Sequence, residues 1–354
     1  MQGVSLIIPM YNESSDIVDV LESIRLQDYP HEAMQLIVVD GGSTDGSPEI
    51  VRSWLDGSDV PGQIVVNPRR TIPTSLNLGL APARPENIVV RLDAHTTYDR
   101  RYVATLVAGF ADAPPTVGCV GGSVIPDAGS RRFDHALVAA LYTNPMGLGG
   151  AAYRFAKTPR AVGSVYLGAW RPGLLQAAGG FDERWEANED SELAIRLRRM
   201  GYDSYWVPVE STYRVKRGPL AAVRQWGRYG YWRAQTLRRH PREWRPRHLV
   251  PPVALFTSAA LLATPLRVLP VLIFLLYAAA IFAKRARGER SAVTAAACLF
   301  FPACQMAWTL GLLRGLVAGI SDVATVNGRT SGALSSPADR SRPAGEPLGA
   351  TRRA

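Results

Sequence analysis

Two acidic loops near the N-terminus carry side chains suited to binding a base and a ribose. Pro9 to Glu13 reads PMYNE and Asp40 to Gly46 reads DGGSTDG, and each loop follows a run of apolar residues. Carboxylates accept hydrogen bonds from the N–H and O–H donors of a nucleoside. Neither loop has the glycine spacing of a dinucleotide fingerprint or a Walker loop, so phosphate-cradling sites of those kinds are not predicted. Alone, the glycine-containing loop could equally be only a turn.

A third loop combines a carboxylate with an imidazole at Asp93 and His95. In an extended backbone, residues two apart point the same way, so the two side chains could share a divalent cation. Such a cation would stabilise a departing nucleotide diphosphate, and the nitrogen ligand favours Mn²⁺ slightly over Mg²⁺. An isolated Asp-x-His could also be an ordinary surface pair, so the interpretation depends on the other loops.

Two later segments add candidates for catalysis and for binding. Glu189, Asp190 and Glu192 open a predicted helix, and one of them could be a general base that deprotonates an attacking hydroxyl. Acidic residues at a helix start are also favoured by the helix dipole, which is a sufficient structural explanation. The segment RQWGRYGYWR, residues 224–233, interleaves arginines with aromatics. It could stack on sugars and pair with phosphates, or form a belt at a membrane interface.

Alternating strands and helices must position these loops. Apolar runs that end near Pro9, Asp40 and Asp93 predict buried strands, and another strand is expected at Gln63–Val66, with helices between them. This alternation is typical of a mostly parallel, Rossmann-like α/β sheet. Ligands of such sheets bind beyond the carboxyl ends of the strands, where the three polar loops lie. The sequence therefore predicts one site built from them.

The charge of the chain is concentrated in one stretch. The formal net charge is +10, and ten Arg and one Lys against one Glu lie between Arg214 and Val250, directly before the most apolar part of the chain. This position fits a cytoplasmic segment beside a membrane. Nucleic acid is not a predicted partner, because no binding module accompanies the charge. The three cysteines show no pairing pattern and the first residues no signal peptide, so a reducing compartment is expected.

Three hydrophobic runs follow the basic stretch, at residues 250–266, 268–283 and 291–313. The last is long enough to span a bilayer, and the first two are short for that purpose. A buried hairpin of a soluble protein is the alternative. With the basic segments inside the cell, three crossings would place the C-terminal tail outside.

Taken in this order, the motifs resemble the family 2 glycosyltransferases with a GT-A fold, over about residues 3–240. The resemblance implies a nucleotide-sugar donor, and it assigns the contact with a uracil base to Asp40. Including that aspartate, the implied nucleotide-binding residues are Pro9, Tyr11, Glu13, Asp40 and Asp93.

The same resemblance assigns the remaining site residues. Asp93 and His95 occupy the place of the family's metal-binding Asp-x-Asp motif, from which His95 departs. Asp190 would be the catalytic base, and Glu189 would position the acceptor or the leaving diphosphate. The acceptor and diphosphate site is implied by a match to the family's Gln-x-x-Arg-Trp motif, with Tyr in place of Trp, at Gln225, Arg228 and Tyr229. The tyrosine weakens any inference of processive synthesis.

Four further segments are similar to the ExoA-type membrane glucosyltransferases of succinoglycan assembly: Asn67–Asn77, Arg91–His95, Tyr166–Trp170 and Arg238–Pro241. This similarity implies inverting transfer of a sugar, glucose from UDP-glucose, to a lipid-linked saccharide at the cytoplasmic membrane. We expect a GT-A domain at residues 1–240, membrane-associated helices at 241–320 and a disordered tail at 321–354. Two alternatives stay open: a polyprenyl-phosphate sugar synthase, and a non-catalytic membrane scaffold with a degenerate transferase domain.

Overall fold

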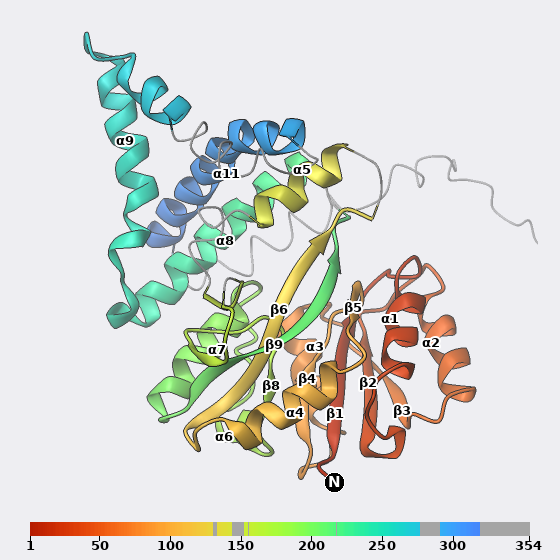
Figure 1. Cartoon of the computed structure of the whole chain (residues 1–354). Helices are drawn as coiled ribbons and strands as arrows, with labels where there is room; N and C mark the ends of the chain where they lie inside the picture. Colours follow the sequence, from red (N-terminus) through yellow and green to blue (C-terminus); the bar gives the residue numbers. More distant parts are fainter. Residues whose placement is uncertain (130–132, 144–151, 155, 217, 277–290, 319–354) are drawn as a thin grey trace, which may run out of the picture. The chain divides into compact units, whose positions relative to one another are not determined.

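The first half of the sheet is parallel, as the alternation of strands and helices predicts (Figure 1). The computed structural model describes residues 1–129, 133–143, 152–154, 156–216, 218–276 and 291–318. Its first elements are β1 (Val4–Met10), α1 (Ile17–Arg25), η1 (His31–Ala33), β2 (Met34–Asp40), α2 (Ser47–Asp56), β3 (Gly62–Val66), α3 (Ile72–Leu80) and β4 (Ile88–Arg91). The strands lie in the order β3-β2-β1-β4. The chain order reverses at β1, so the carboxyl ends of β1 and β4 form a switch point of the kind that binds ligands.

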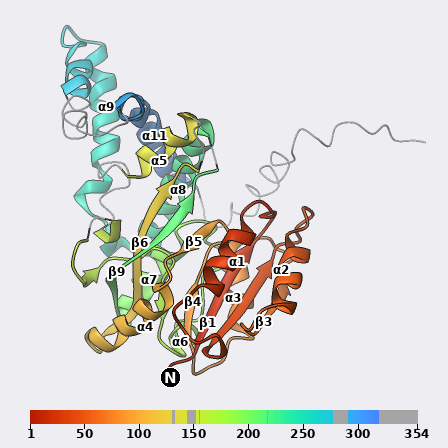
Figure 2. The ribbon, with the colours of Figure 1, turned by 45° about the vertical axis from the view of Figure 1, so that its right-hand side comes forward.

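Helices cover both faces of this half of the sheet, which explains why its strands are apolar throughout. Leu6 and Ile8 of β1 pack in one cluster with residues of α1 and α2, and Ile7 packs on the other face with Leu76 of α3. Figure 2 shows α1 and α2 together beside these strands. The contact with α3 is close, because a Cβ added to Gly79 would meet Ile7 at 2.5 Å.

The second half of the sheet mixes strand directions. It contains β5 (Thr96–Tyr98), α4 (Tyr102–Asp112), β6 (Val117–Asp127), α5 (Phe133–Tyr142), η2 (Ala152–Arg154), β7 (Arg160–Val162), β8 (Ala169–Trp170), α6 (Leu174–Ala177), α7 (Glu189–Arg199) and β9 (Asp203–Arg214). The short β8 joins β4 to β6 with antiparallel pairing on both sides. The long strands β6 and β9 run parallel to each other, and β5 and β7 pair antiparallel with β9.

Helices follow the sheet in the C-terminal part: α8 (Pro219–Arg239), η3 (Pro241–Glu243), η4 (Pro246–His248), α9 (Val250–Leu262) and α11 (Ser291–Val317). Of the described residues, one helix stretch, Ala295–Val317, is long and apolar enough to cross a membrane. It coincides with most of the third predicted hydrophobic run. Residues 277–290, which include part of the second run, and the predicted tail lie outside the described residues.

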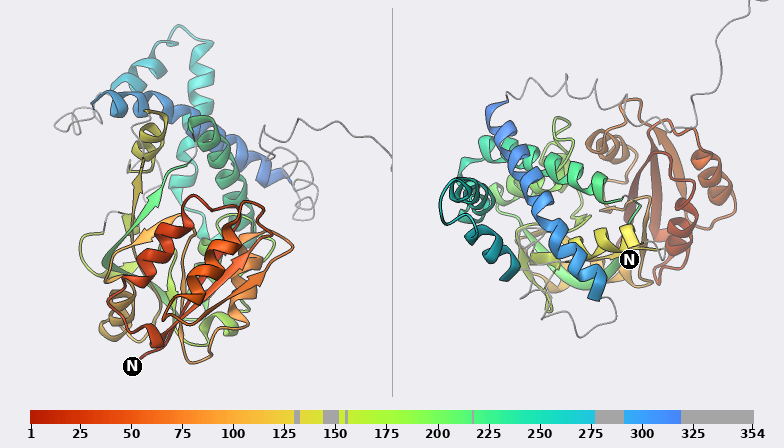
Figure 3. Two further views of the ribbon diagram at one scale, coloured as in Figure 1. Left: turned by 90° about the vertical axis from the view of Figure 1, so that its right-hand side faces the viewer. Right: turned by 90° about the horizontal axis from the view of Figure 1, so that it is seen from above.

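Glycines bring α8 and α11 into backbone contact. A Cβ added to Gly230 of α8 would lie 2.0 Å from the carbonyl oxygen of Trp308, and one added to Gly311 of α11 would lie 2.0 Å from that of Gly227. Any larger side chain would therefore force the helices apart. Figures 1 and 3 show α8 and α11 side by side. The apolar helix α11 is thus held directly against the helix that carries the Gln225–Tyr229 motif.

A buried histidine in η4, between α8 and α9, should make the stability of the fold depend on pH. Burial, with the nearby charges of Arg233, Arg247 and Arg245, lowers the pKa of His248 to about 4. An unfolded chain takes up this proton near pH 6.5, which the native state resists, so stability is lost as the pH falls from about 6.5 towards 4. We expect His248→Asn, whose Oδ1 can replace Nδ1 as acceptor for the Arg245 N–H, to flatten the dependence of the melting temperature on pH across this window. An unchanged slope would contradict this assignment.

Candidate active site

The loops after β1 and β2 are joined by hydrogen bonds that close the nucleotide end of the predicted site. The backbone N–H of Asn12 donates to Ser43 Oγ at 2.8 Å, and that of Ser14 donates to Asp45 at 2.9 Å. Asp40 is buried and accepts hydrogen bonds from the backbone N–H of Gly42 at 3.0 Å and from Ser43 Oγ at 2.6 Å. Asp40 therefore shapes its own loop, which is the loop that the sequence assigns to the base.

Tyr11 presents an exposed aromatic ring beside these loops. The residue is 44% exposed, and the guanidinium of Arg70 lies 5.1 Å from the ring centroid. Arg70 also donates to the Tyr11 hydroxyl at 3.3 Å, and a Cβ added to Gly42 would meet Arg70 Nη2 at 3.6 Å. An aromatic face with an adjoining cation can stack on a base and pair with a phosphate.

Asp93 and His95 lie in a turn rather than in extended backbone, so the predicted conformation is wrong. The N–H of Thr96 donates to the Asp93 carbonyl at 3.3 Å, and β5 begins at Thr96. Asp93 accepts from Tyr166 at 3.3 Å and lies 3.5 Å from an Arg91 nitrogen. His95 instead contacts Glu13, with Nδ1 3.1 Å from Oε1. The turn arises because β4 ends at Arg91 and the chain enters β5, which pairs with β9, within a few residues.

The Glu13–His95 contact joins the loop after β1 to the turn after β4. Glu13 also forms an ion pair with Lys216, which bridges to the buried Asp16. Burial opposes ionisation of Glu13, but His95 and Lys216 lower its pKa below the ordinary value. A carboxylate that binds Nδ1–H of a histidine leaves Nε2 available as a metal ligand, which is a common arrangement in metal sites.

A buried ion pair links the same region to α7. Arg91 Nη1 lies 2.7 Å from Glu189 Oε1, and the two side chains are 9% and 7% exposed. Burial raises the pKa of Glu189, and the charge of Arg91 opposes that rise. Because Arg91 also reaches Asp93, one guanidinium connects the predicted metal ligand to the acidic pair at the start of α7.

Asp190, the predicted catalytic base, makes few contacts of its own among the described residues. Its Oδ1 accepts the backbone N–H of Ser191 at 2.6 Å, and within the described residues no side chain is hydrogen-bonded to it. The preceding Asn188 has a positive φ of 62° and donates from Nδ2 to the Tyr229 carbonyl at 3.2 Å. This contact fixes the start of α7 against α8, which holds Asp190 near the junction of the two helices.

The residues of the predicted motif on α8 lie in two different environments. Gln225 Nε2 donates to the Tyr229 hydroxyl at 2.6 Å, and Gln225 Oε1 accepts from Tyr142 at 3.0 Å. Arg228 is exposed and lies at the limit of a hydrogen bond, 3.5 Å from the Glu186 carbonyl. Gln225 and Tyr229 are thus brought together, whereas Arg228 can turn towards a ligand.

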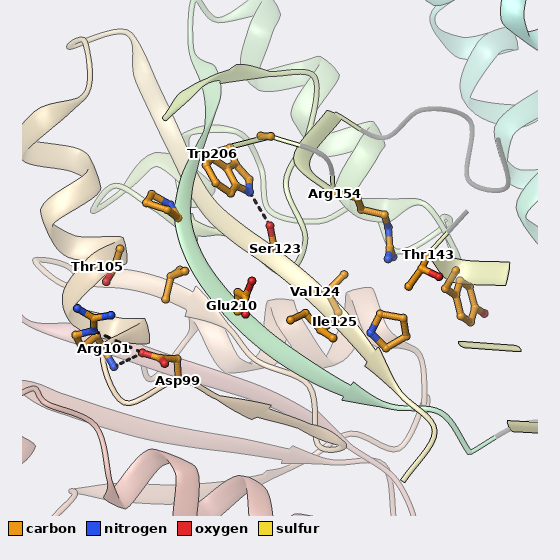
Figure 4. Close-up of a pocket in the computed structure, with 15 residues that line it drawn as sticks. Asp99, Arg101, Thr105, Ser123, Val124, Ile125, Thr143, Arg154, Trp206 and Glu210 are labelled. Atoms are coloured by element: carbon orange, nitrogen blue, oxygen red, sulfur yellow. Dashed lines mark hydrogen bonds and ion pairs between the residues drawn. The ribbon is translucent and has the colours of Figure 1, made fainter. Parts of the chain in front are cut away.

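A separate cavity of about 790 Å³ lies along β6 and β9 and holds none of the predicted site residues (Figure 4). Trp206 lines it and donates from Nε1 to Ser123 at 3.0 Å. Asp99 and Arg101 lie at one end of the labelled residues, and Arg154 lies towards the other.

Comparison with known proteins decides the family. A family model described as "Glycosyl transferase family 2" matches residues 5–165, and one described as "Glycosyl transferase family group 2" matches residues 88–313, which is more than half of the chain. The chain belongs to the family 2 glycosyltransferases. The predicted family is therefore confirmed, and the chain is an enzyme that transfers a sugar.

Individual relatives of this glycosyltransferase are similar over most of their length. "Succinoglycan biosynthesis protein ExoA" of Rhizobium meliloti is 29% identical over 317 residues, 88% of this chain and 94% of the relative. A Methanococcus voltae glucuronosyltransferase, whose name refers to a dolichyl phosphate-linked sugar, is 22% identical over 68% of this chain and 75% of the relative. The similarity to ExoA confirms the predicted subfamily resemblance.

Solved structures confirm the GT-A fold. A mannosyltransferase from Pyrobaculum calidifontis, in complex with GDP-Man and Mn²⁺, is 25% identical with a TM-score of 0.60, over 89% of this chain and 87% of that one. S. aureus TarS in complex with UDP-GlcNAc is 15% identical with a TM-score of 0.50, over 74% of each chain, and supports the fold alone.

Two charged residues of this glycosyltransferase site have roles that the sequence does not predict. Arg91 stands in the sequence only as part of a motif, yet an arginine at the end of an otherwise apolar strand signals a buried partner. Lys216 belongs to the basic stretch interpreted as juxtamembrane, and its pairing with Glu13 depends on β9 returning to the loop after β1. Only Arg91 carries a signal in the local sequence.

Proposed function

We propose that this glycosyltransferase moves a sugar, with UDP-glucose as the expected donor, to a lipid-linked saccharide, with inversion at the anomeric carbon. The observation that carries the proposal is the placement of Asp190: a carboxylate without a side-chain partner among the described residues, beside a buried pair that reaches Asp93. The names of two relatives, which refer to succinoglycan synthesis and to a dolichyl phosphate-linked sugar, support a saccharide carried on a lipid.

The chain's own residues divide the work between donor and acceptor. Tyr11 and the Asp40 loop would hold the nucleoside, and Arg70 would meet a phosphate. Asp190 would accept the proton of the acceptor hydroxyl as its oxygen attacks the anomeric carbon and the nucleotide diphosphate leaves. Arg91 would keep Glu189 in place and so orient the start of α7.

The residues fit a divalent cation shared with the substrate. The carboxylate of Asp93 has only long contacts, to Tyr166 at 3.3 Å and to Arg91 at 3.5 Å, so it can bind a cation. His95 offers Nε2, because its Nδ1 contacts Glu13. Diphosphate oxygens of the donor would complete the coordination of such an ion. Such a cation, Mn²⁺ or Mg²⁺, would neutralise charge on the leaving diphosphate. The Mn²⁺ in the mannosyltransferase complex supports this assignment.

Glu13 should strengthen metal binding through His95. We expect Glu13→Gln to weaken Mn²⁺ binding in the presence of UDP by about tenfold or more, because orienting partners of metal-bound histidines contribute roughly 10–100-fold to affinity. Mn²⁺ titration followed by electron paramagnetic resonance measures this directly. The exposed Glu22→Gln on α1 is the matched control and should change nothing. Equal Mn²⁺ affinity of wild type and Glu13→Gln would refute the role.

The C-terminal part supports attachment of the enzyme to a membrane. The side chains of α9 and of residues 266–276 include many exposed apolar groups, and α11 contains the one span-length stretch of the described residues. The basic stretch that precedes α9 would face the cytoplasm. The catalytic domain would then act on an acceptor anchored in the inner face of the membrane.

A donor screen tests the proposal. Detergent-purified enzyme is given UDP-glucose, UDP-galactose, UDP-N-acetylglucosamine or GDP-mannose with a membrane lipid extract, with Mn²⁺ or with EDTA, and release of nucleotide diphosphate is followed. We expect release from one donor, dependent on the metal and on the lipid extract. No release of nucleotide diphosphate from any donor, together with no binding of any nucleotide diphosphate, would refute the proposal.

A further inference from the structure

One arginine close to Asp190 has no partner of its own among the described residues. Arg233 of α8 is half-buried, and within that part of the chain its side chain forms no ion pair or hydrogen bond. Neighbouring arginines differ: Arg196 binds Glu192, and Arg198 lies 3.6 Å from Glu243. Burial of a cation without a partner is unfavourable, so a half-buried unpaired guanidinium is suited to an anionic ligand.

The helix geometry places Arg233 on the side of α8 that meets the start of α7. Gln225, Tyr229 and Arg233 are spaced four residues apart and so share one face of α8. The Tyr229 carbonyl accepts a hydrogen bond from Asn188, the residue before the acidic pair. Burial and the charge of Arg247 lower the pKa of Arg233, whereas the charges of Asp190 and Glu243 raise it, so both carboxylates lie within electrostatic reach of the guanidinium.

Another face of α8 holds the apolar helix α11, through Gly227 and Gly230. In Figures 1 and 2, α8 lies between α7 and α11. Arg245 and Arg247 lie in and beside η4, directly before α9, where Val253 and Phe256 are 59% and 57% exposed. Arg233 thus belongs to the helix that meets both the start of α7 and the apolar helix α11.

We propose that Arg233, with Arg247 beside it, binds the phosphate or diphosphate that links the acceptor saccharide to its lipid. This inference rests on the proposed function and names the group that the acceptor site holds. We assign the donor diphosphate to residues at the ends of β1, β2 and β4, and UDP binding in the test below separates the two phosphate sources. An arginine fork can bind phosphate oxygens in pairs, which a lysine cannot reproduce.

Binding of farnesyl diphosphate in detergent tests the site without requiring catalysis. We expect Arg233→Met to raise its Kd by about tenfold or more, the loss typical of a charge-assisted contact, and Arg233→Lys to lie between. UDP binding with Mn²⁺ should be unchanged, which also shows that the variant is folded. Arg224→Met, an exposed arginine elsewhere on α8, removes the same charge and should bind like wild type.

Other outcomes overturn the site. An unchanged Kd for farnesyl diphosphate in Arg233→Met would refute the proposed phosphate site. An equal loss of UDP binding would instead assign Arg233 to the donor. Equal losses in Arg224→Met, matched by weaker binding to phosphatidylglycerol vesicles, would indicate only a diffuse basic surface. Farnesyl diphosphate binding that requires Arg233, in an enzyme that turns over no nucleotide sugar, would refute the proposed function and leave the site standing.

Discussion

Asp190→Asn should reduce transfer by about 10²–10⁴-fold, the usual contribution of a general base, while leaving donor binding unchanged. The amide keeps the shape of the side chain and can still accept the Ser191 N–H, but it cannot take a proton from the acceptor hydroxyl. Initial rates of nucleotide diphosphate release with the lipid acceptor measure the first effect, and titration with the donor measures the second.

The exposed carboxylate of Glu49 on α2 supplies a control, because Glu49→Gln removes a charge that lies far along the chain from the acidic pair. Turnover by Asp190→Asn at the rate of the wild type would rule out Asp190 as the base. A matched loss of donor affinity would instead place Asp190 on the donor.

Arg91→Met should destabilise the fold by about 3–5 kcal/mol, the typical cost of removing one partner from a buried ion pair. Glu189 would be left buried without its cation, and the pKa of Glu189 would rise further because the opposing charge of Arg91 would be gone. Thermal unfolding followed by tryptophan fluorescence measures the loss.

The double variant Arg91→Met/Glu189→Met separates stability from function. Replacing both charges by apolar groups of similar volume should restore most of the stability, because neither member of the pair stays buried without its partner. The transfer activity of the double variant should nevertheless be low, because Asp93 and the start of α7 lose the arginine that both contact. Full activity in the double variant would show that the pair serves only the fold.

Much of the fold is predictable because its signals are local. The apolar runs that form β1, β2 and β4 are buried on both faces, so their hydrophobicity and their polar ends both appear in the sequence. The antiparallel β8 has two residues and leaves no such pattern. Its place between β4 and β6 depends on long-range pairing that no short motif announces.

The candidate site likewise combines features that the local sequence predicts with features that depend on long-range contacts. The sequence indicates Asp93, His95 and Asp190, because chemically reactive side chains follow strands or open a helix. It cannot show that the chain turns at Asp93, because that turn depends on β5 pairing with the distant β9. The contacts of Glu13 with Lys216 and of Arg91 with Glu189 join residues far apart in sequence, so only the folded chain reveals them.

Transfer of radiolabelled sugar into the lipid fraction tests the proposed reaction in a single assay. Wild type and Asp190→Asn are incubated with the donor selected by the screen and with membrane lipids, and labelled lipid is treated with mild acid to release its saccharide. We predict label in an oligosaccharide with the wild type and almost none with Asp190→Asn. Label released as a single sugar would point to a polyprenyl-phosphate sugar synthase, and no labelled lipid from the wild type would contradict the proposed function.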